Sequence, residues 1–444
     1  MSEWKKIKIG DFLKRKRIPI QLESDKEYKL ITIKLYHKGV YLRGNKKGSE
    51  IHSNMYKVSK GDFILSGIDA RNGAFGIVPD SLDGAIVTND FWYFDIDELI
   101  IKKEFFLWLT STPVFLDACQ KASMGETQRI RLQKDAFFNY QIKCPSIEYQ
   151  DEFLARINPI IEKIKIIQSE TEKQTEYTKL LRQNILQEAI EGKLTADWRK
   201  QNPVQKGNPD YDAEALFEQI QKEKSQYKSE KLQEPLFFES LNIPQGWEYP
   251  TLFEITKQIT DGTHITPNYV SDGEVFLSAQ NVKPFKFIPE VHKFVSKKDF
   301  DIYRNNRTPE REDILMARVG AGIGEAAVID TDLQFAFYVS LCLIKTFSNF
   351  CDVTYLCLVL NSAYGTKYAK NNISSNGSSA GNYNLGHIRS LKIPLPPLAE
   401  QKEIVKQVEK HLKTLSDLEV QITERELLTK KLMQSILKDA FEGK

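Results

Sequence analysis

L-R-Q-N-I-L-Q-E-A-I-E-G-K is the sequence from Leu181 to Lys193, and L-M-Q-S-I-L-K-D-A-F-E-G-K closes the chain from Leu432 to Lys444. Eight of the thirteen paired residues are identical, at a constant offset of 251 positions. The same offset carries Gln150 to Gln401, so nothing is inserted across the whole run. Because an internal repeat outweighs any single short motif, the sequence predicts a duplicated unit.

Both copies of the repeat are predicted to form long helices, because apolar residues step by four and three as in a heptad seam. Polar residues interrupt the seam at Thr178 and at Thr429. Each helix has a sibling in the same chain, so the two are expected to pack on each other. Pro159 is expected to kink or restart the first helix. The seam and subunit interface is assigned to Ile157, Ile160, Ile164, Ile167, Leu181, Ile185, Val408, Leu415, Leu418, Ile422, Leu432 and Ile436.

The composition is that of a globular chain. The length of 444 residues favours two or three domains, and a hydrophobic content of 41% allows an ample core. A net charge of +2 excludes a uniformly basic DNA-coating protein, so any nucleic-acid surface has to be local. No apolar run approaches the ~18 residues of a membrane span, and the N-terminal sequence lacks an apolar signal core. Five cysteines without C-x-x-C spacing indicate reduced, buried thiols in a cytoplasmic protein.

The pattern along the chain predicts an α+β fold with five segments. Two mixed α/β globular domains are expected at residues 1–143 and 245–394, each followed by a helical segment, 144–194 and 395–444, with a polar connector at 195–244. Strands are predicted at Lys29–Ile33 and Asp62–Leu65, a helix at Ile101–Thr110, and a short helix in the connector from Asp212 to Lys224. The offset of 251 also maps Asp62 to Asp313, while most of the two domains differ. The scaffold is therefore repeated closely, whereas the domains it carries have diverged.

Two divergent domains joined by two near-identical helices resemble the specificity (S) subunit of type I DNA restriction–modification enzymes. The helix openings from Pro145 to Glu152 and from Pro397 to Glu403 carry the resemblance. So do the I-L-x-x-A-x-x-G-K-L ending from Ile185 to Leu194 and the Gly246-Trp247 entry to the second domain. Together with the paired G-D-I-L-type segments, the resemblance covers essentially the whole chain.

This resemblance implies that each globular domain is a target recognition domain that reads one half of a bipartite double-stranded DNA site. The two helices, antiparallel in a pseudo-twofold arrangement, would set the spacing between the halves and dock two methyltransferase subunits, which motor-nuclease subunits then join. S-adenosylmethionine, ATP and Mg would belong to those partners, with no cofactor in this chain. The alternatives are a specificity subunit of a fused methyltransferase–nuclease or phage-defence system and, from another class, a coiled-coil scaffold without a DNA role.

The sequence carries no catalytic motif of the expected kinds, which predicts a chain that is not itself an enzyme. The sequence has neither a G-x-x-x-x-G-K-[ST] phosphate loop nor the [DN]-P-P-[YF] motif of amino-methyltransferases. Arg318 to Gly324 is similar to a dinucleotide fingerprint, but a β-type run follows it, so a turn between strands is expected. His264 has no second His or Cys at ligand spacing, so no metal site is expected there.

Candidate DNA contacts are basic residues of the first domain and polar or basic residues of the second, where two polar loops follow predicted strand ends, since such side chains contact phosphates and base edges. An ordinary solvated basic surface is the alternative for any one of them. In the first domain the candidates are Lys34, His37, Lys38, Arg43, Lys46 and Lys47, with Arg71, Arg129 and Arg131 nearby in the family's fold. In the second domain they are Thr263, His264, Ser278, Gln280, Asn281, Arg304, Arg307 and Arg318.

Overall fold

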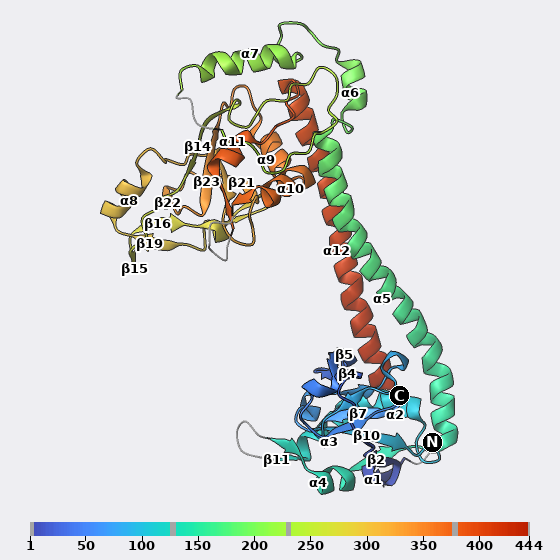
Figure 1. Cartoon of the computed structure of the whole chain (residues 1–444). Helices are drawn as coiled ribbons and strands as arrows, with labels where there is room; N and C mark the ends of the chain where they lie inside the picture. The colour runs from blue at the N-terminus through green and yellow to red at the C-terminus, as the bar shows by residue number, and fades with distance from the viewer. Residues whose placement is uncertain (1–3, 125–129, 228–231, 375–380, 443–444) are drawn as a thin grey trace. The chain divides into compact units, whose positions relative to one another are not determined.

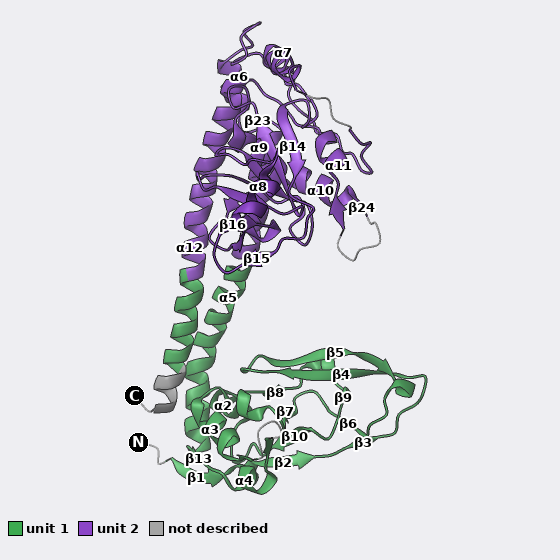
Figure 2. Ribbon diagram, turned by 90° about the vertical axis from the view of Figure 1, so that its left-hand side faces the viewer, with its two compact units in different colours: residues 1–172, 424–444 green, residues 173–423 purple. Residues whose placement is uncertain are grey.

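The computed structural model describes residues 4–124, 130–227, 232–374 and 381–442, and Figure 1 labels part of their helices and strands. The chain forms two compact units (Figure 2). Unit 1 comprises Met1–Glu172 and Glu424–Lys444, and unit 2 comprises Lys173–Thr423. Each unit therefore holds one globular domain and a part of both long helices. Within the described ranges, none of the helices has the length and apolar character that crossing a bilayer requires.

Unit 1 is built on an antiparallel four-stranded sheet in the order β2-β10-β7-β8. In β7, Phe63 and Leu65 join one buried cluster with aromatic residues of the helices α2 and α3, whereas Ile64 joins a second cluster. Successive side chains of a strand point to opposite faces of its sheet, so this sheet separates two cores. The elements are β2 (Leu13–Lys16), β7 (Phe63–Ser66), β8 (Phe75–Ile77), β10 (Phe91–Ile96), α2 (Lys103–Thr110) and α3 (Pro113–Lys121).

The second core of unit 1 lies against a five-stranded sheet in the order β3-β6-β9-β4-β5. The strands β4 and β5 form a long hairpin, and β5 is one of the two edge strands of the sheet (Figure 2). In β5 only Val40 is buried, while Tyr41, Leu42 and Arg43 are exposed, so most of this strand faces solvent. The strands are β3 (Pro19–Ile20), β4 (Glu27–Lys34), β5 (Gly39–Lys47), β6 (Met55–Lys57) and β9 (Ile86–Val87).

Unit 2 repeats the first sheet of unit 1. Its order, β14-β23-β20-β21, is again antiparallel throughout. In β20, Ile314 and Met316 join the cluster under α9 and α10, and Leu315 joins the other core, as the offset of 251 from β7 predicts. The elements are β14 (Thr256–Asp261), β20 (Ile314–Ala317), β21 (Ala326–Val328), β23 (Leu341–Thr346), α9 (Val353–Asn361) and α10 (Ala363–Asn371). The structure thus confirms the predicted duplication.

The units differ in the segment that follows the first strand of the shared sheet in the sequence, between β2 and β7 in unit 1 and between β14 and β20 in unit 2. In unit 2 this segment forms a four-stranded sheet in the order β15-β19-β16-β22, with β16 and β22 parallel and with helix α8 beside it. Strand β22 follows β21 in the chain, as β9 follows β8 in unit 1, so the two second sheets share this crossing and differ in the number and order of their strands. These elements are β15 (Tyr269–Val270), β16 (Glu274–Leu277), β19 (Lys293–Val295), α8 (Lys297–Arg304) and β22 (Phe335–Phe337).

Short elements complete both units. Unit 1 also contains β1 (Lys5–Lys8), α1 (Ile9–Phe12), β11 (Ser123–Met124), β12 (Arg131–Leu132), α4 (Lys134–Asn139) and β13 (Gln141–Cys144). Unit 2 also contains α6 (Ala196–Gln201), α7 (Ala213–Lys224), β17 (Val282–Lys283), β18 (Lys286–Phe287), β24 (Ile373–Ser374), β25 (Asn382–Tyr383) and α11 (Leu385–Ser390). Helix α7 confirms the helix predicted in the connector, and the β20–β21 turn confirms the turn predicted after Arg318.

The long helices are α5 (Ile147–Ile190) and α12 (Leu398–Glu442). A glutamine at the equivalent position near the start of each helix forms hydrogen bonds to the domain that precedes it. The side-chain amide of Gln150 accepts a hydrogen bond from the Lys102 backbone N–H at 2.7 Å, and Gln401 accepts one from Asp352 at 2.9 Å. Both glutamines are fully buried, and each also donates to the carbonyl of the proline five residues earlier. The repeated glutamine therefore ties each helix to the domain before it.

Helix α5 runs through Pro159 without a break, so the expected restart of the helix at that residue was wrong. Proline removes one backbone N–H from the helix. The neighbouring Ile157 and Ile161 are buried in the core of unit 1, and this packing holds the turn in place. In unit 1, Met433 and Ile436 of α12 pack on this same cluster. In unit 2, Ile185 and Leu186 of α5 share a cluster with Ile404 and Val408 of α12, so the end of each helix lies near the start of the other. Arg182 of α5 also pairs with Glu419 in the middle of α12 at 3.1 Å.

The helix seam is narrower than the sequence pattern predicts. Residues seven apart are buried, at Ile157, Ile164 and Ile185 in α5 and at Val408, Leu415 and Ile422 in α12. The alternate seam positions are exposed instead: Ile160, Ile167, Leu181, Leu418 and Leu432 are between 38% and 49% accessible. These five residues are called the outer row below. One face of each helix is used by its own chain, and the outer row stays free to be covered by something else.

Candidate nucleic-acid interface

The basic candidates of unit 1 gather on the β4–β5 hairpin. Lys34, Arg43, Lys46 and Lys47 are all exposed on its two strands. The Lys34 ammonium lies 4.3 Å from the centre of the Tyr41 ring, a cation–π contact that holds both side chains on the same face. Positive charge on an exposed edge strand is an arrangement that suits a phosphate backbone.

The turn of this hairpin is held in an unusual backbone conformation. Tyr36 and His37 have φ values of 60° and 58°, a left-handed backbone conformation that residues other than glycine seldom adopt. Their N–H groups donate to the Asn72 and Gly73 carbonyls at 2.9 and 3.0 Å. Desolvation lowers the pKa of His37, whose ring also meets Phe75 edge-on at 4.8 Å. The turn therefore brings His37 and the exposed Lys38 close to Arg71, which precedes Asn72.

Two further candidates of unit 1 lie elsewhere. Arg131 on β12 pairs with Asp90 at 2.8 Å and keeps 58% of its side chain exposed. Arg129 lies outside the described residues.

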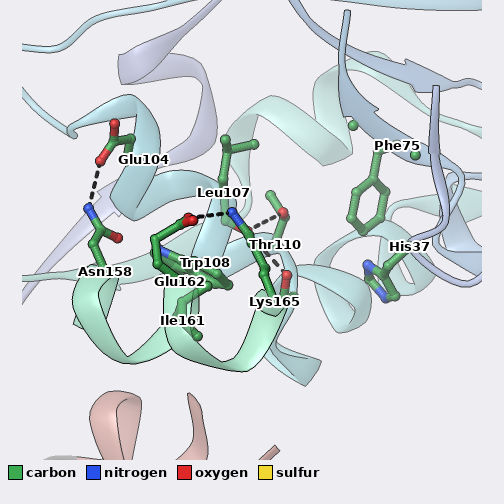
Figure 3. A pocket seen from close by; sticks show the side chains of 13 residues that line it. His37, Phe75, Glu104, Leu107, Trp108, Thr110, Asn158, Ile161, Glu162 and Lys165 are labelled. Carbon is green, nitrogen blue, oxygen red and sulfur yellow. Dashed lines mark hydrogen bonds and ion pairs between the residues drawn. The ribbon is translucent and has the colours of Figure 1, made fainter. Parts of the chain in front are cut away.

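A hollow of about 610 Å³ opens between the hairpin turn, α2 and α5, and His37 lines it (Figure 3). Its two glutamates have partners in the lining, Glu104 with Asn158 at 3.0 Å and Glu162 with Lys165 at 2.7 Å, so the one lysine is paired and the hollow adds no excess of positive charge to the hairpin.

In unit 2 the fold brings together two groups of candidates that lie about forty residues apart in the sequence. Thr263 and His264 follow strand β14, and Arg307 follows helix α8. These residues line one hollow of about 410 Å³, together with Asn305 and Asn306. Arg304 lines a neighbouring hollow that shares Asn305 and Asn306 with the first. The structure thus joins the loop after β14 and the end of α8 into a single polar surface.

Within that surface the side chains have different roles. His264 is exposed over 66% of its side chain, and its Nε2 lies 3.0 Å from the Asp261 carboxylate. Thr263 is buried, its N–H donates to the Phe337 carbonyl, and its hydroxyl accepts from the Ile265 N–H at 3.1 Å. Thr263 therefore shapes the loop, whereas His264 is presented to solvent.

The turn from Ser278 to Asn281 is also divided between an exposed and an enclosed residue. Gln280 is exposed and Ser278 is half-buried. Asn281 is fully buried, with its amide donating to the Ile288 and Val291 carbonyls at 2.8 and 2.6 Å. The Asn281 side chain closes the turn and occupies an interior position instead of the exposed one that a base contact requires.

Arg318 is likewise in the interior, with only 4% of its surface accessible. Its guanidinium forms an ion pair with Asp261, donates to the Asn382 side-chain oxygen at 3.1 Å, and donates to the Tyr383 carbonyl at 3.1 Å. The structure therefore gives Arg318 a buried position, not the exposed position that the predicted phosphate or guanine contact needs. Asn382 was not among the sequence candidates, because no local pattern connects it to a residue 64 positions away.

A family model described as the type I restriction modification DNA specificity domain matches residues 1–176 and 244–425, which is most of the chain and includes both globular domains.

Comparison with curated proteins finds two specificity subunits from Escherichia coli. The chain is 21% identical over 358 residues to the type I restriction enzyme EcoDI specificity subunit, with 78% of this chain and 71% of that protein covered. It is 27% identical over 187 residues to the EcoBI specificity subunit, with 42% and 38% covered.

Solved structures share the fold. A chain from a structure of the assembly and conformational transition of the type I R-M system has a TM-score of 0.64 at 16% identity, with 99% of this chain and 97% of that one covered. The HsdS subunit of Thermoanaerobacter tengcongensis has a TM-score of 0.50 at 17% identity and the same coverage.

Proposed function

We propose that this chain, which belongs to the family of type I restriction–modification DNA specificity proteins, reads a bipartite and asymmetric DNA site, one half with each unit. The observation that carries the proposal is the combination of a repeated sheet with unlike additions. Both units keep the sheet order of β2-β10-β7-β8, and each adds its own second sheet. A repeated frame with diverged readers suits two half-sites of different sequence.

The exposed candidates on each unit supply a chemically suitable DNA face. In unit 1 these are Lys34, Lys38, Arg43, Lys46 and Lys47, on and beside the edge hairpin. In unit 2 they are His264, Gln280, Arg304 and Arg307, with the last two half-buried. Lysine and arginine neutralise phosphates, while histidine, glutamine and arginine form hydrogen bonds to base edges.

The outer row of the long helices supports docking of other subunits. Five large apolar side chains at seam positions are between 38% and 49% exposed, although their neighbours in the seam are buried. Apolar residues repeated along a helix are usually covered by another helix. We propose that two methyltransferase subunits cover the outer row and that motor-nuclease subunits join through them.

In this proposal the chain itself carries out no chemical step. S-adenosylmethionine, ATP and Mg are cofactors of the partner subunits, and the chain contributes sequence choice and geometry. The complex would act in the cytoplasm, on the DNA of the cell.

The experiment that tests the proposal is single-molecule methylation sequencing of host DNA with and without this gene. The expected result is a split, asymmetric methyladenine motif that disappears on deletion and returns when the gene is supplied on a plasmid. A methylome that keeps every motif after deletion would contradict the proposal and favour a scaffold role. Genes for a separate methyltransferase and motor beside this one, as opposed to one fused gene, would separate the type I assignment from the fused system.

A further inference from the structure

The loop after β14 is braced from inside by an ionic cluster that ends at the protein surface. One oxygen of the Asp261 carboxylate, Oδ2, contacts both the Arg318 guanidinium and the His264 ring. Arg318 is 4% accessible and Asp261 is 8% accessible, whereas the His264 side chain is 66% exposed. The cluster therefore runs from a buried cation through a buried carboxylate to an exposed imidazole.

The hydrogen bond to Asp261 fixes which ring atom of His264 is available to a ligand. A carboxylate accepts hydrogen bonds, so Nε2 of His264 carries the hydrogen and donates it to Asp261. Nδ1 is then the ring nitrogen left for an outside group. This division of the two nitrogens resembles the support that orients histidines in functional sites, where a carboxylate holds one nitrogen and the other acts.

The buried end of the cluster is anchored to a different strand. Arg318 Nη2 donates to Asn382 Oδ1 at 3.1 Å, and Arg318 Nε donates to the Tyr383 carbonyl at 3.1 Å, both on β25. A guanidinium offers several donors in a rigid, planar arrangement, so it fixes direction as well as charge. Arg318 thus fixes the orientation of the Asp261 carboxylate, and this carboxylate in turn orients the ring of His264.

The position that His264 occupies is lined with groups that can bind nucleic acid. The hollow beside it includes Thr260, Asn305, Asn306 and Arg307, and Asn306 has a φ of 58°. The Asn306 carbonyl accepts from the Gln258 amide at 2.9 Å, which fixes this backbone. Amide, hydroxyl and guanidinium groups around one imidazole provide both donors and acceptors, which is the chemistry needed at a base edge.

Among its described residues, unit 1 has no such cluster at the equivalent positions, although it has the same sheet. Phe94 and Ile344 are equivalent, because they pair with Phe63 and Ile314, which the offset of 251 relates. Arg15 pairs with Phe94 and Ile259 pairs with Ile344, so Arg15 is equivalent to Ile259. Two residues further on, Arg17 of unit 1 is therefore equivalent to Asp261 of unit 2. The offset of 251 places Gly67 at the position of Arg318. A brace needed by the shared scaffold would occur in both units, as the buried glutamines Gln150 and Gln401 do. The cluster is therefore not part of the shared scaffold, and we attribute it to a role that is particular to unit 2.

From these observations we propose that His264 is a specificity-determining residue of unit 2, and that Asp261 and Arg318 are positioning residues that present its Nδ1 to a base edge. This inference rests on the proposed function, because it assigns a reader within the half-site of unit 2. It gives Arg318 a supporting role in place of a DNA contact.

The test is the methylated motif itself, sequenced from cells that carry the complete system with variants of this chain. In His264→Ala, one half of the motif is expected to accept other bases at one or two adjacent positions, with methylation at those variant sites rising about tenfold, the discrimination of a good base contact. The other half stays unchanged and serves as an internal control. His264→Asn keeps a polar group near the Nδ1 position and should relax the motif less than His264→Gln.

The positioning role is tested by Asp261→Asn and by the double variant Asp261→Asn/His264→Ala. Asp261→Asn is expected to relax the same motif positions as His264→Ala, and the double variant no further than the stronger single one, because Asp261 acts through His264. If Asp261→Asn lowers the melting temperature of the chain, Arg318→Lys replaces it, since lysine keeps the charge beside Asp261 but loses the rigid contacts to β25. Asp272→Asn and His52→Ala, both at exposed positions, are the matched controls.

Three results would overturn the inference. The first is a motif unchanged in both halves by His264→Ala. The second is loss of all methylation at an unaltered melting temperature, which would assign His264 to assembly. The third is an additive double variant. A wild-type gene whose deletion removes no motif would instead contradict the proposed function.

Discussion

The buried carboxylate of Glu400 is expected to control the local stability of the connector in unit 2. Glu400 is 1% accessible and accepts hydrogen bonds from the Thr195 hydroxyl at 2.7 Å, from the Trp247 indole at 2.9 Å, and from Arg199. Arg199 also donates to the Gly192 carbonyl at 2.6 Å and lies over the Trp247 ring at 5.6 Å. One carboxylate therefore joins the end of α5, helix α6, the entry to the second domain and the start of α12.

The expected cost of Glu400→Ala follows from these contacts. Removing one partner of a buried ion pair costs about 3–5 kcal/mol. The Arg199 side chain remains 25% exposed and keeps its bond to Gly192, so the lower end of the range, about 3 kcal/mol, applies. At about 1.4 kcal/mol per factor of ten, this is an increase of roughly two orders of magnitude in local opening. Glu400→Gln keeps one acceptor oxygen and should cost about 1–2 kcal/mol.

Amide hydrogen exchange measures this opening directly. The reporters are the N–H groups of Arg199 and Asn202 in and after α6, which donate to the Thr195 and Trp198 carbonyls at 2.9 Å. Glu409→Gln, at an exposed position of the same helix, is the matched control. Exchange in Glu400→Ala that stays within about threefold of this control would refute the reasoning, because a buried ion pair cannot be lost at so small a cost. The unit 1 equivalent of Glu400 is Tyr149, 5.9 Å from the Trp4 ring, so the brace is ionic in one unit only.

Four further outcomes are expected. Gln150→Ala and Gln401→Ala should each destabilise their own unit by about 1–3 kcal/mol in urea unfolding, because a buried backbone N–H loses its acceptor, while the exposed Gln421→Ala should have no effect. Leu415→Ala should lower the free energy of unfolding by about 2–5 kcal/mol. Leu418, on the same helix, is 44% exposed, so Leu418→Ala should change it by no more than about 0.5 kcal/mol and should instead weaken capture of a methyltransferase subunit. Equal losses of stability would contradict the assignment of the outer row. Burial raises the pKa of the Cys351 and Cys357 thiols to about 12, so a disulfide reagent at pH 8 should modify none of the five buried cysteines until denaturant is added, and rapid labelling of the native chain would disprove it. DNA binding should weaken steeply with salt, and Lys46→Ala/Lys47→Ala should flatten the slope of log K against log salt by about one for each phosphate contact removed; an unchanged slope would exclude these lysines from the interface.

Local pattern was sufficient wherever a structure depends on neighbours in the sequence. The heptad spacing predicted both long helices, and the alternating strand at Phe63–Leu65 reappears at Ile314–Met316 with the same division between two cores. The helical spacing before Pro113 predicted α2, although that proline also begins α3. In each case the signal is contained within a few turns or one strand.

The candidate site was predictable only in part, because exposure is not a local property. Arginine and asparagine in a polar loop have the same appearance in the sequence whether they face DNA or brace a loop. Arg318 and Asn281 proved to be buried, whereas His264 and Gln280 are exposed. The outer row shows the same limit, since the heptad pattern marks both seam positions as apolar without stating which of them the sibling helix covers.

The sequence alone was enough to establish a duplicated unit with two long helices, two diverged domains and a scaffold that repeats residues such as Gln150 and Gln401. Repetition and periodicity are preserved in one dimension, so they can be read without coordinates. The tertiary structure was needed to show that Arg318 is buried between Asp261 and Asn382, and that the loop after β14 meets the end of α8. Contacts between residues 57 and 64 positions apart depend on how strands pair and sheets pack, and no local pattern encodes that pairing.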